Sequence, residues 1–320
     1  MLKLIDTGSP LSAPSKTAKI PIGNYRRFML RFFGTNQTSK NIDRTDIGDI
    51  ILFRNGQQVR HLPFNFIHLR SNLKHGFAGY TRNAAGAFAI TAWLDMELDG
   101  LPNTMDIQRS DEAYFRFQFD QTDPGIASAT TLAAASWELY GAEDESIIES
   151  YELREYTHNI IAAGAGRPTE VLEGRNIGAL FFIDAAPAVT NINVLRDKEQ
   201  MFNGDDAALV EYTNMNNRVE AGLPIGEIPF VSKDPSNALN EEIILQPTFS
   251  GAGTLEVYVA ELNFENSKPA ASLARAQSGA RRRLARQSKV TQEQVNLVSP
   301  LLRIDPGKLV VPRTRSSVFQ

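Results

Sequence analysis

The 320-residue chain contains no cysteine. Disulfide frameworks, cysteine-ligated zinc, iron–sulfur clusters and thiol nucleophiles are therefore excluded. The stability of the folded protein must come from packing, hydrogen bonds, ions or assembly.

Long hydrophobic runs are also missing. No stretch approaches the ~20 apolar residues that a membrane-spanning helix needs. The chain begins with a charged segment, but glycine, serine and proline follow where a signal peptide would have its apolar segment. Hydrophobic residues make up 42% of the chain and charged residues 22%. This balance is ordinary for a globular protein and excludes disorder over most of its length. We therefore expect a soluble protein made without an export signal.

Motifs of catalysis are lacking too. The sequence has neither a Gly-x-Ser-x-Gly nucleophile motif nor a Gly-x-x-x-x-Gly-Lys phosphate loop. Its four histidines, His61, His68, His75 and His158, show neither the i, i+4 nor the His-x-His spacing of a metal site such as that of a double-domain cupin. The acidic run 143–145 could supply a glycosidase pair, but acidic neighbours in a hydrophilic run are more typical of a solvated connection between domains. The sequence therefore carries no catalytic signature, and we expect no cofactor other than the calcium ion considered next.

One acidic segment resembles the start of a calcium loop. Asp95, Glu97 and Asp99 alternate, and Gly100 occupies the sixth position. The match is imperfect, because the third position is glutamate and the twelfth is Asp106. These three carboxylates are a candidate calcium site; the alternative is an acidic turn after a strand.

Short apolar runs bounded by turn residues dominate the chain between positions 25 and 264. The run 50–53 ends at Asn55-Gly56, a strong signal for a two-residue hairpin, because both central residues of a type I′ turn need positive φ. Segments 114–119 and 255–259 alternate in the way that half-buried strands do.

Two segments depart from this strand pattern. Segments 64–74 and 205–220 are predicted to be helical, with Asp205 as the N-cap of the second. The fold class is therefore predicted to be all-β with short inserted helices.

The chain also resembles itself at a nearly constant offset in residue number, mostly 130 (177 − 47) and 123 at the last strand (254 − 131). Several matches in order indicate a duplication, although each alone is weak. The matched segments are 47–53 with 177–183, 111–115 with 241–245, the strands ending at Gly34 and Gly164, and 131–132 with 254–255.

Each half has about eight strand-like segments, which suits a jelly roll. The sequence thus predicts two tandem eight-stranded jelly rolls. The predicted domains are an N-terminal arm (1–20), a first jelly roll (21–144), a second jelly roll (145–266) and a basic C-terminal helix and extended arm (267–320).

Segments 21–35 and 47–59 resemble the first strands of double jelly-roll major capsid proteins of tailless, membrane-containing icosahedral bacteriophages, such as corticoviruses and tectiviruses. The duplication extends the resemblance to positions 20–266. The resemblance implies a non-enzymatic virion protein, made in the host cytoplasm. It would form a homotrimer that presents six jelly rolls as a pseudo-hexameric capsomer of an icosahedral shell. Its partners would be other capsid subunits and minor capsid or penton proteins.

The C-terminal segment differs in charge from the rest. Positions 268–320 hold eleven of the 33 basic and two of the 37 acidic residues, so this tail carries +9 and the remainder −13. We expect the tail to contact the inner membrane, packaged DNA or neighbouring capsomers; the alternative is a disordered solubilising tail. The candidate contact residues are Arg275, Arg281, Arg282, Arg283, Arg286, Lys289, Arg313 and Arg315.

A carbohydrate-binding, lectin-like β-sandwich is the alternative function. Its sugar platforms would be the two tryptophans, Trp93 and Trp137, but both fall in strand-like runs, where a place in the core is more common.

Overall fold

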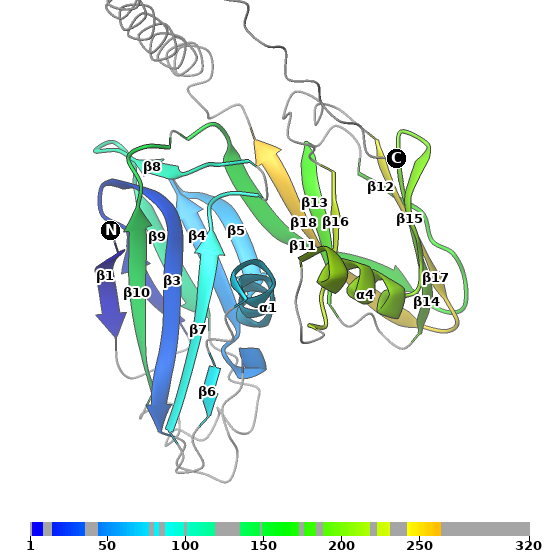
Figure 1. The fold of residues 1–320 in the computed structure, drawn as a ribbon, viewed down its shortest axis with the longest axis horizontal. Helices are drawn as coiled ribbons and strands as arrows, with labels where there is room; N and C mark the ends of the chain where they lie inside the picture. Colours follow the sequence, from blue (N-terminus) through cyan, green and yellow to red (C-terminus); the bar gives the residue numbers. More distant parts are fainter. Residues whose placement is uncertain are drawn as a thin grey trace, which may run out of the picture. The chain divides into compact units, whose positions relative to one another are not determined.

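A computed structural model describes residues 2–8, 15–35, 44–76, 80–82, 87–98, 101–118, 135–147, 149–172, 176–183, 188–217, 223–230 and 242–263. Most of these residues form strands (Figure 1). Within these ranges no helix is both long and apolar enough to cross a membrane.

The first half is a jelly roll with two facing four-stranded sheets. One has the order β1-β10-β3-β7 (Figure 1), and the other has the order β2-β9-β4-β5. Two short strands add to the first sheet, β6 (Tyr80–Arg82) beside β7 and β8 (Met105–Ile107) beside β3. The eight main strands are β1 (Leu2–Gly8), β2 (Ser15–Lys19), β3 (Gly23–Thr35), β4 (Asp49–Arg54), β5 (Gln57–Pro63), β7 (Ala87–Asp95), β9 (Ala113–Gln118) and β10 (Ala135–Glu143).

The second half has the same architecture. Its sheets have the orders β11-β18-β13-β16 and β12-β17-β14-β15. Its strands are β11 (Glu152–Ala162), β12 (Glu170–Leu172), β13 (Ile177–Phe182), β14 (Val189–Arg196), β15 (Glu199–Gly204), β16 (Gly226–Pro229), β17 (Ile243–Phe249) and β18 (Gly253–Asn263).

The two halves share one connectivity. When the eight main strands of each half are counted in chain order, both halves have sheets of order 1-8-3-6 and 2-7-4-5. This is the order of a jelly roll, in which the chain passes between two sheets as nested antiparallel pairs. The predicted fold class, two tandem jelly rolls with short inserted helices, is confirmed.

A hairpin followed by a helix is the best-preserved unit of the duplication. The β4–β5 turn has positive φ at Asn55 and Gly56, as predicted, and the β14–β15 turn has positive φ at Asp197 and Lys198. The helices after these turns, α1 (Phe64–His75) and α4 (Asp206–Asn217), are both 12 residues long. The turns and the helices have the same offset in residue number, 142 (197 − 55 and 206 − 64).

Both helices were predicted, and their ends have clear causes. The Asp205 carboxylate accepts a hydrogen bond from the Ala208 N–H at 2.8 Å and so caps α4 as expected. At the end of α1, Gly76 is left-handed with φ of 61°, and its N–H donates to the Asn72 carbonyl.

The predicted offset of 130 is right for one pair of equivalent strands and wrong for two. β9 and β17 are equivalent, as the match of 111–115 with 241–245 requires. The match of 47–53 with 177–183 instead joins β4 to β13, which is equivalent to β3. The strand at Gly34 is β3, whereas the strand that ends just before Gly164 is β11, which is equivalent to β1. The match of 131–132 lies outside the described residues. The offset falls along the chain because the loops of the two halves differ in length.

The segment 1–20, predicted as an arm, contributes the first two strands of the first jelly roll. β1 pairs with β10 from Leu2 to Gly8, and β2 pairs with β9 from Ser15 to Lys19. Both are edge strands. Edge strands are commonly short and polar, which made this segment look like a connection.

Each jelly roll buries its own apolar core. In the first, rings from the facing sheets meet edge to face, with Phe28 and Phe115 at 5.1 Å and Phe32 and Phe117 at 5.9 Å between centroids. The core of the second is mainly aliphatic and includes Val194. Since such aromatic and aliphatic side chains each contribute roughly 1.5–3 kcal/mol on burial, the two cores are the main source of stability.

Candidate functional site at the junction of the jelly rolls

The two jelly rolls meet edge to edge. β5 is the edge of one sheet of the first jelly roll, and β11 is the edge of one sheet of the second. The two strands pair in parallel at a single position, Arg60 opposite Glu155. This pairing produces one eight-stranded sheet that runs through both halves, β16-β13-β18-β11-β5-β4-β9-β2.

A buried ion triad lies at this position. The Glu155 carboxylate is paired with two arginines of the first jelly roll: Arg60 Nη1 forms an ion pair with Oε2 at 2.6 Å, and Arg70 of α1 donates a hydrogen bond to Oε1. The side chains of Arg60 and Glu155 are only 1% and 2% exposed. Arg60 Nη2 also contacts the Met96 sulfur at 3.7 Å.

The charges of the triad depend on one another. Burial lowers the pKa of Arg60, and Glu155 only partly offsets this effect. Burial alone would also lower the pKa of Arg70. The negative charges of Glu155, Glu227 and Asp95 outweigh this effect, so the pKa of Arg70 is raised. An arginine stays protonated in either case, so Glu155 is the carboxylate that pairs directly with two almost fully buried cations.

Aromatic stacking surrounds the triad. Phe66 of α1 stacks on Tyr258 of β18 at 4.3 Å with an interplanar angle of 8°, and it meets Phe181 of β13 edge to face at 5.4 Å. The Arg70 guanidinium lies 4.7 Å over the Phe181 ring. The outer face of the second jelly roll's sheet is thus buried against α1, and all six residues of β13 are buried.

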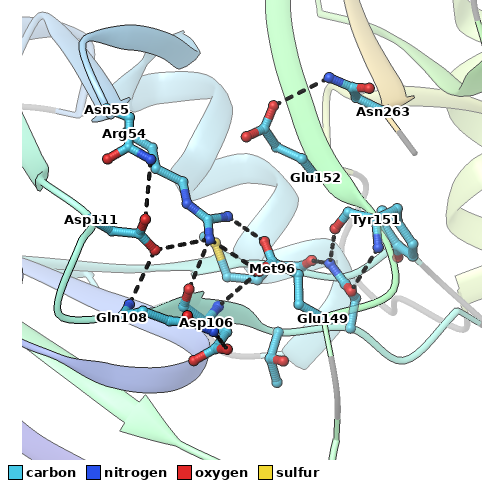
Figure 2. A network of polar contacts seen from close by, with 12 residues as sticks. Arg54, Asn55, Met96, Asp106, Gln108, Asp111, Glu149, Tyr151, Glu152 and Asn263 are labelled. Carbon is cyan, nitrogen blue, oxygen red and sulfur yellow. Dashed lines mark hydrogen bonds and ion pairs between the residues drawn. The ribbon is translucent and has the colours of Figure 1, made fainter. Parts of the chain in front are cut away.

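A polar network fixes the segment that connects the two halves (Figure 2). Arg54, at the end of β4, bonds Glu149 of the connection at 2.5 Å, Asp111 at 3.3 Å and the Asp106 carbonyl at 2.8 Å. Burial raises the pKa of Glu149 despite the opposing effect of Arg54. This connection is therefore held by buried charge on the first jelly roll.

Two asparagines add direct bonds to the backbone of the connection. The Asn103 amide donates to the Tyr151 carbonyl at 2.9 Å and accepts from the Ser150 N–H at 2.8 Å. Asn24 donates to the carbonyls of Asp144 and Ile147 at 2.8 and 2.7 Å. The acidic run 143–145, weighed as a glycosidase pair, leads into this tethered connection.

The candidate calcium residues lie beside basic side chains. Asp95, at the end of β7, is buried and lies 3.0 Å from His75 and 3.9 Å from Lys74, and Glu97 is bonded by Arg26 at 2.9 Å. Asp99 lies outside the described residues. Among the residues that the structure describes, no three His, Asp or Glu side chains are grouped to hold a metal.

The candidate tail residues, from Arg275 to Arg315, also lie outside the described residues. The two tryptophans have different places: Trp137 is in the core at 4% exposed, and Trp93 is half-buried with the Arg27 guanidinium 5.5 Å from its ring.

Sequence reasoning missed the triad of Arg60, Glu155 and Arg70. The only signal was a charged residue inside each of two strand-like runs and one in a helical run. Such residues are usual at exposed positions, so nothing in the local pattern marked these three as buried.

Structural comparisons identify the fold. The chain is similar to the major capsid protein P2 of bacteriophage PM2, with a TM-score of 0.59 and 11% identity over 83% of this chain and 99% of that one. It is also similar to a chain of Sulfolobus Turreted Icosahedral Virus (TM-score 0.57, 12% identity, 90% of this chain and 96% of that one). A third similar structure is the PBCV-1 virus capsid (TM-score 0.54, 9% identity, 82% and 92%). No family model matches the sequence, and no curated protein matches it.

At these identities the likeness establishes the fold. The chain has the fold of viral major capsid proteins, which is the double jelly roll that its own strand order shows.

The triad predicts an unequal response to substitution. Glu155→Gln removes the carboxylate that pairs directly with two buried arginines and should lower the free energy of unfolding by about 3–5 kcal/mol. Glu170→Gln removes the partner of His158 in a partly exposed pair and should cost less than about 1 kcal/mol. Urea unfolding followed by circular dichroism measures both. Equal losses in the two variants would contradict the role of the triad.

Asp95 predicts a dependence of stability on pH. Burial alone would raise the pKa of its carboxyl, but the hydrogen bond to His75 and the charges of Lys74 and Arg70 lower it from 3.8 to about 2. Because the folded value is the lower one, Asp95 contributes stability above pH 3.8 that is lost as the pH falls through about 2. The contribution is about 2 kcal/mol.

Asp95→Asn should therefore flatten the fall in the free energy of unfolding as the pH is lowered from about 5 toward about 2. Asp49→Asn, at an exposed carboxylate, is the matched control. An unchanged slope in the Asp95 variant would contradict the assignment.

Calcium binding by Asp95, Glu97 and Asp99 stays a prediction. Calcium would have to displace the basic partners of the first two carboxylates. A calorimetric titration with calcium chloride tests it: heat that Glu97→Gln abolishes would support a site, and no heat would remove it.

Proposed function

We propose that the protein is a viral major capsid protein. The observation that carries this proposal is the repeated strand order 1-8-3-6 and 2-7-4-5 in two jelly rolls that share one sheet. The similarity to P2 of bacteriophage PM2 over nearly the whole length of that chain supports it. The role is structural: many copies make repeated contacts that close a shell.

The assembly unit in this proposal is a homotrimer. Three chains supply six jelly rolls that share the same strand order, and these six can form a pseudo-hexameric capsomer. A heterologous contact that closes after three steps forms a ring and leaves no open end. The junction supports this arrangement, because its buried triad and stacked rings hold each pair of jelly rolls as one body. The partners in the shell would be further capsomers and minor capsid or penton proteins.

The basic tail, positions 268–320, is proposed to act after the trimer has formed. Its charge of +9 suits the inner membrane, packaged DNA or the acidic bodies of neighbouring capsomers, since the preceding part of the chain carries −13. The protein would then be located in the virion.

A lectin-like role has less support. One of the two tryptophans that would stack on a sugar is in the core, and the other lies next to an arginine.

Deletion of the segment 268–320 tests the proposal. We expect size-exclusion chromatography with light scattering to give a trimer for both the full chain and the deletion variant. Electron microscopy should show shells or membrane-bound arrays for the full chain alone. A monomeric full chain would contradict the capsid proposal, and normal particles from the deletion variant would contradict the role of the tail.

A further inference from the structure

The equivalent helices of the two jelly rolls differ in burial. Nine of the 12 residues of α1 are buried, but only three of the 12 residues of α4 are. Both helices pack on the equivalent strand of their own jelly roll, α1 on β7 and α4 on β16. The difference must therefore arise from what covers the other side of each helix.

The second jelly roll covers α1. Its outer sheet face, formed by β11, β18 and β13, supplies Glu155, Tyr258 and Phe181 to Phe66 and Arg70 of the helix. When the two helices are aligned from their first residues, Phe64 and Asp206, Phe66 corresponds to Ala208 of α4 and Arg70 corresponds to Tyr212.

The corresponding side of α4 is exposed and apolar. Tyr212 is 54% exposed and Met215 is 72% exposed. Ala208 is exposed as well and completes an i, i+4, i+7 stripe with them. Ala208 and Tyr212 occupy the positions at which Phe66 and Arg70 of α1 contact the second jelly roll, and Met215 lies next to them on the same side of the helix.

The first jelly roll has the matching surface. Its strands β1, β10 and β3 are equivalent to β11, β18 and β13, and their outer face includes Leu2 and Leu4, which are 47% and 50% exposed. The side chains of β3 that point into the core are buried, whereas those on the outer face are only half-buried. The outer face holds Leu2, Leu4, Arg27, Met29, Arg31, Phe33, Glu138, Tyr140 and Ala142.

The chemistry of this face is that of a protein interface. Aromatic residues, methionine and arginine are the types enriched where proteins bind one another. Arg31 lies 4.6 Å over the Phe33 ring and bonds Glu138 at 2.9 Å, which holds its side chain flat on the sheet. Arg27 is likewise paired with Asp95, at 3.7 Å. The match between the two surfaces therefore rests on their apolar and aromatic side chains.

We propose that α4 of one copy docks on the outer face of β1, β10 and β3 of a second copy, and so repeats between chains the contact that buries α1 within the chain. First and second jelly rolls would then alternate around a ring. This inference rests on the proposed trimer and names the surfaces that close it.

The absence of cysteine allows a direct test. A chain with Tyr212→Cys and Met29→Cys, treated with a short bismaleimide, should give covalent dimers and trimers on a denaturing gel. Either substitution alone should give neither species. A mixture of the two single variants should give covalent dimers but no covalent trimers, because each chain then has only one cysteine and can form only one cross-link.

A second measurement uses two positions with equal exposure. Met215→Glu should weaken trimer formation on the order of tenfold to a hundredfold, the range of a residue central to an interface. Ile161→Glu on β11, also 72% exposed, should leave the trimer intact. Because both side chains are exposed, neither substitution should disturb the fold of the chain, and both variants should keep the circular dichroism spectrum of the wild type.

The outcomes separate this inference from the proposed function. A wild-type chain that is monomeric in light scattering would overturn the trimer itself. A trimeric wild type that gives no cross-link in the double variant, and that Met215→Glu leaves unchanged, would overturn the α4 interface alone.

Discussion

Glu155 is placed between two arginines of the other jelly roll, in a position closed to water. Two buried cations without a counter-ion would cost several kcal/mol each, so the carboxylate and the guanidinium groups must meet in one geometry. That geometry fixes the pairing of β11 with β5, since Arg60 and Glu155 are the residues that face each other there. It also fixes α1, whose Arg70 completes the triad. The orientation of one jelly roll on the other, the continuous eight-stranded sheet and the burial of Phe66 all depend on this one contact.

The duplication explains both the similarity of the halves and their main difference. Strand order, the hairpin turn and the helix after it are retained, because each is needed to build a jelly roll from a single chain. The surroundings of the helices differ, because one jelly roll is covered by its neighbour in the chain and the other is not. The buried Arg70 and the exposed Tyr212 occupy equivalent places. The arginine is paired with Glu155 within the chain, whereas the tyrosine is exposed.

Local signals in the sequence were reliable where one short segment decides the structure. The Asn55-Gly56 turn and the cap at Asp205 were predicted correctly, because backbone conformation and capping depend on a few adjacent residues. The repeat was recognised, but two of its strand matches were wrong, since loops of unequal length change the offset along the chain. The edge strands β1 and β2 were missed for a different reason. Their partners, β10 and β9, lie far away along the chain, and their own composition resembles that of a connection.

The sequence by itself determined the fold class, the number of jelly rolls, the positions of both helices and the contrast between an acidic body and a basic tail. These properties follow from periodicity, turn chemistry and composition, all of which can be read along the chain. Only the tertiary structure decided which charges are buried and which faces are open. Arg60 and Glu155 are ordinary strand residues in the sequence, and they become a buried pair because two sheet edges meet at them. Tyr212 and Met215 resemble ordinary helix residues, and they stand out because the equivalent side of α1 is covered.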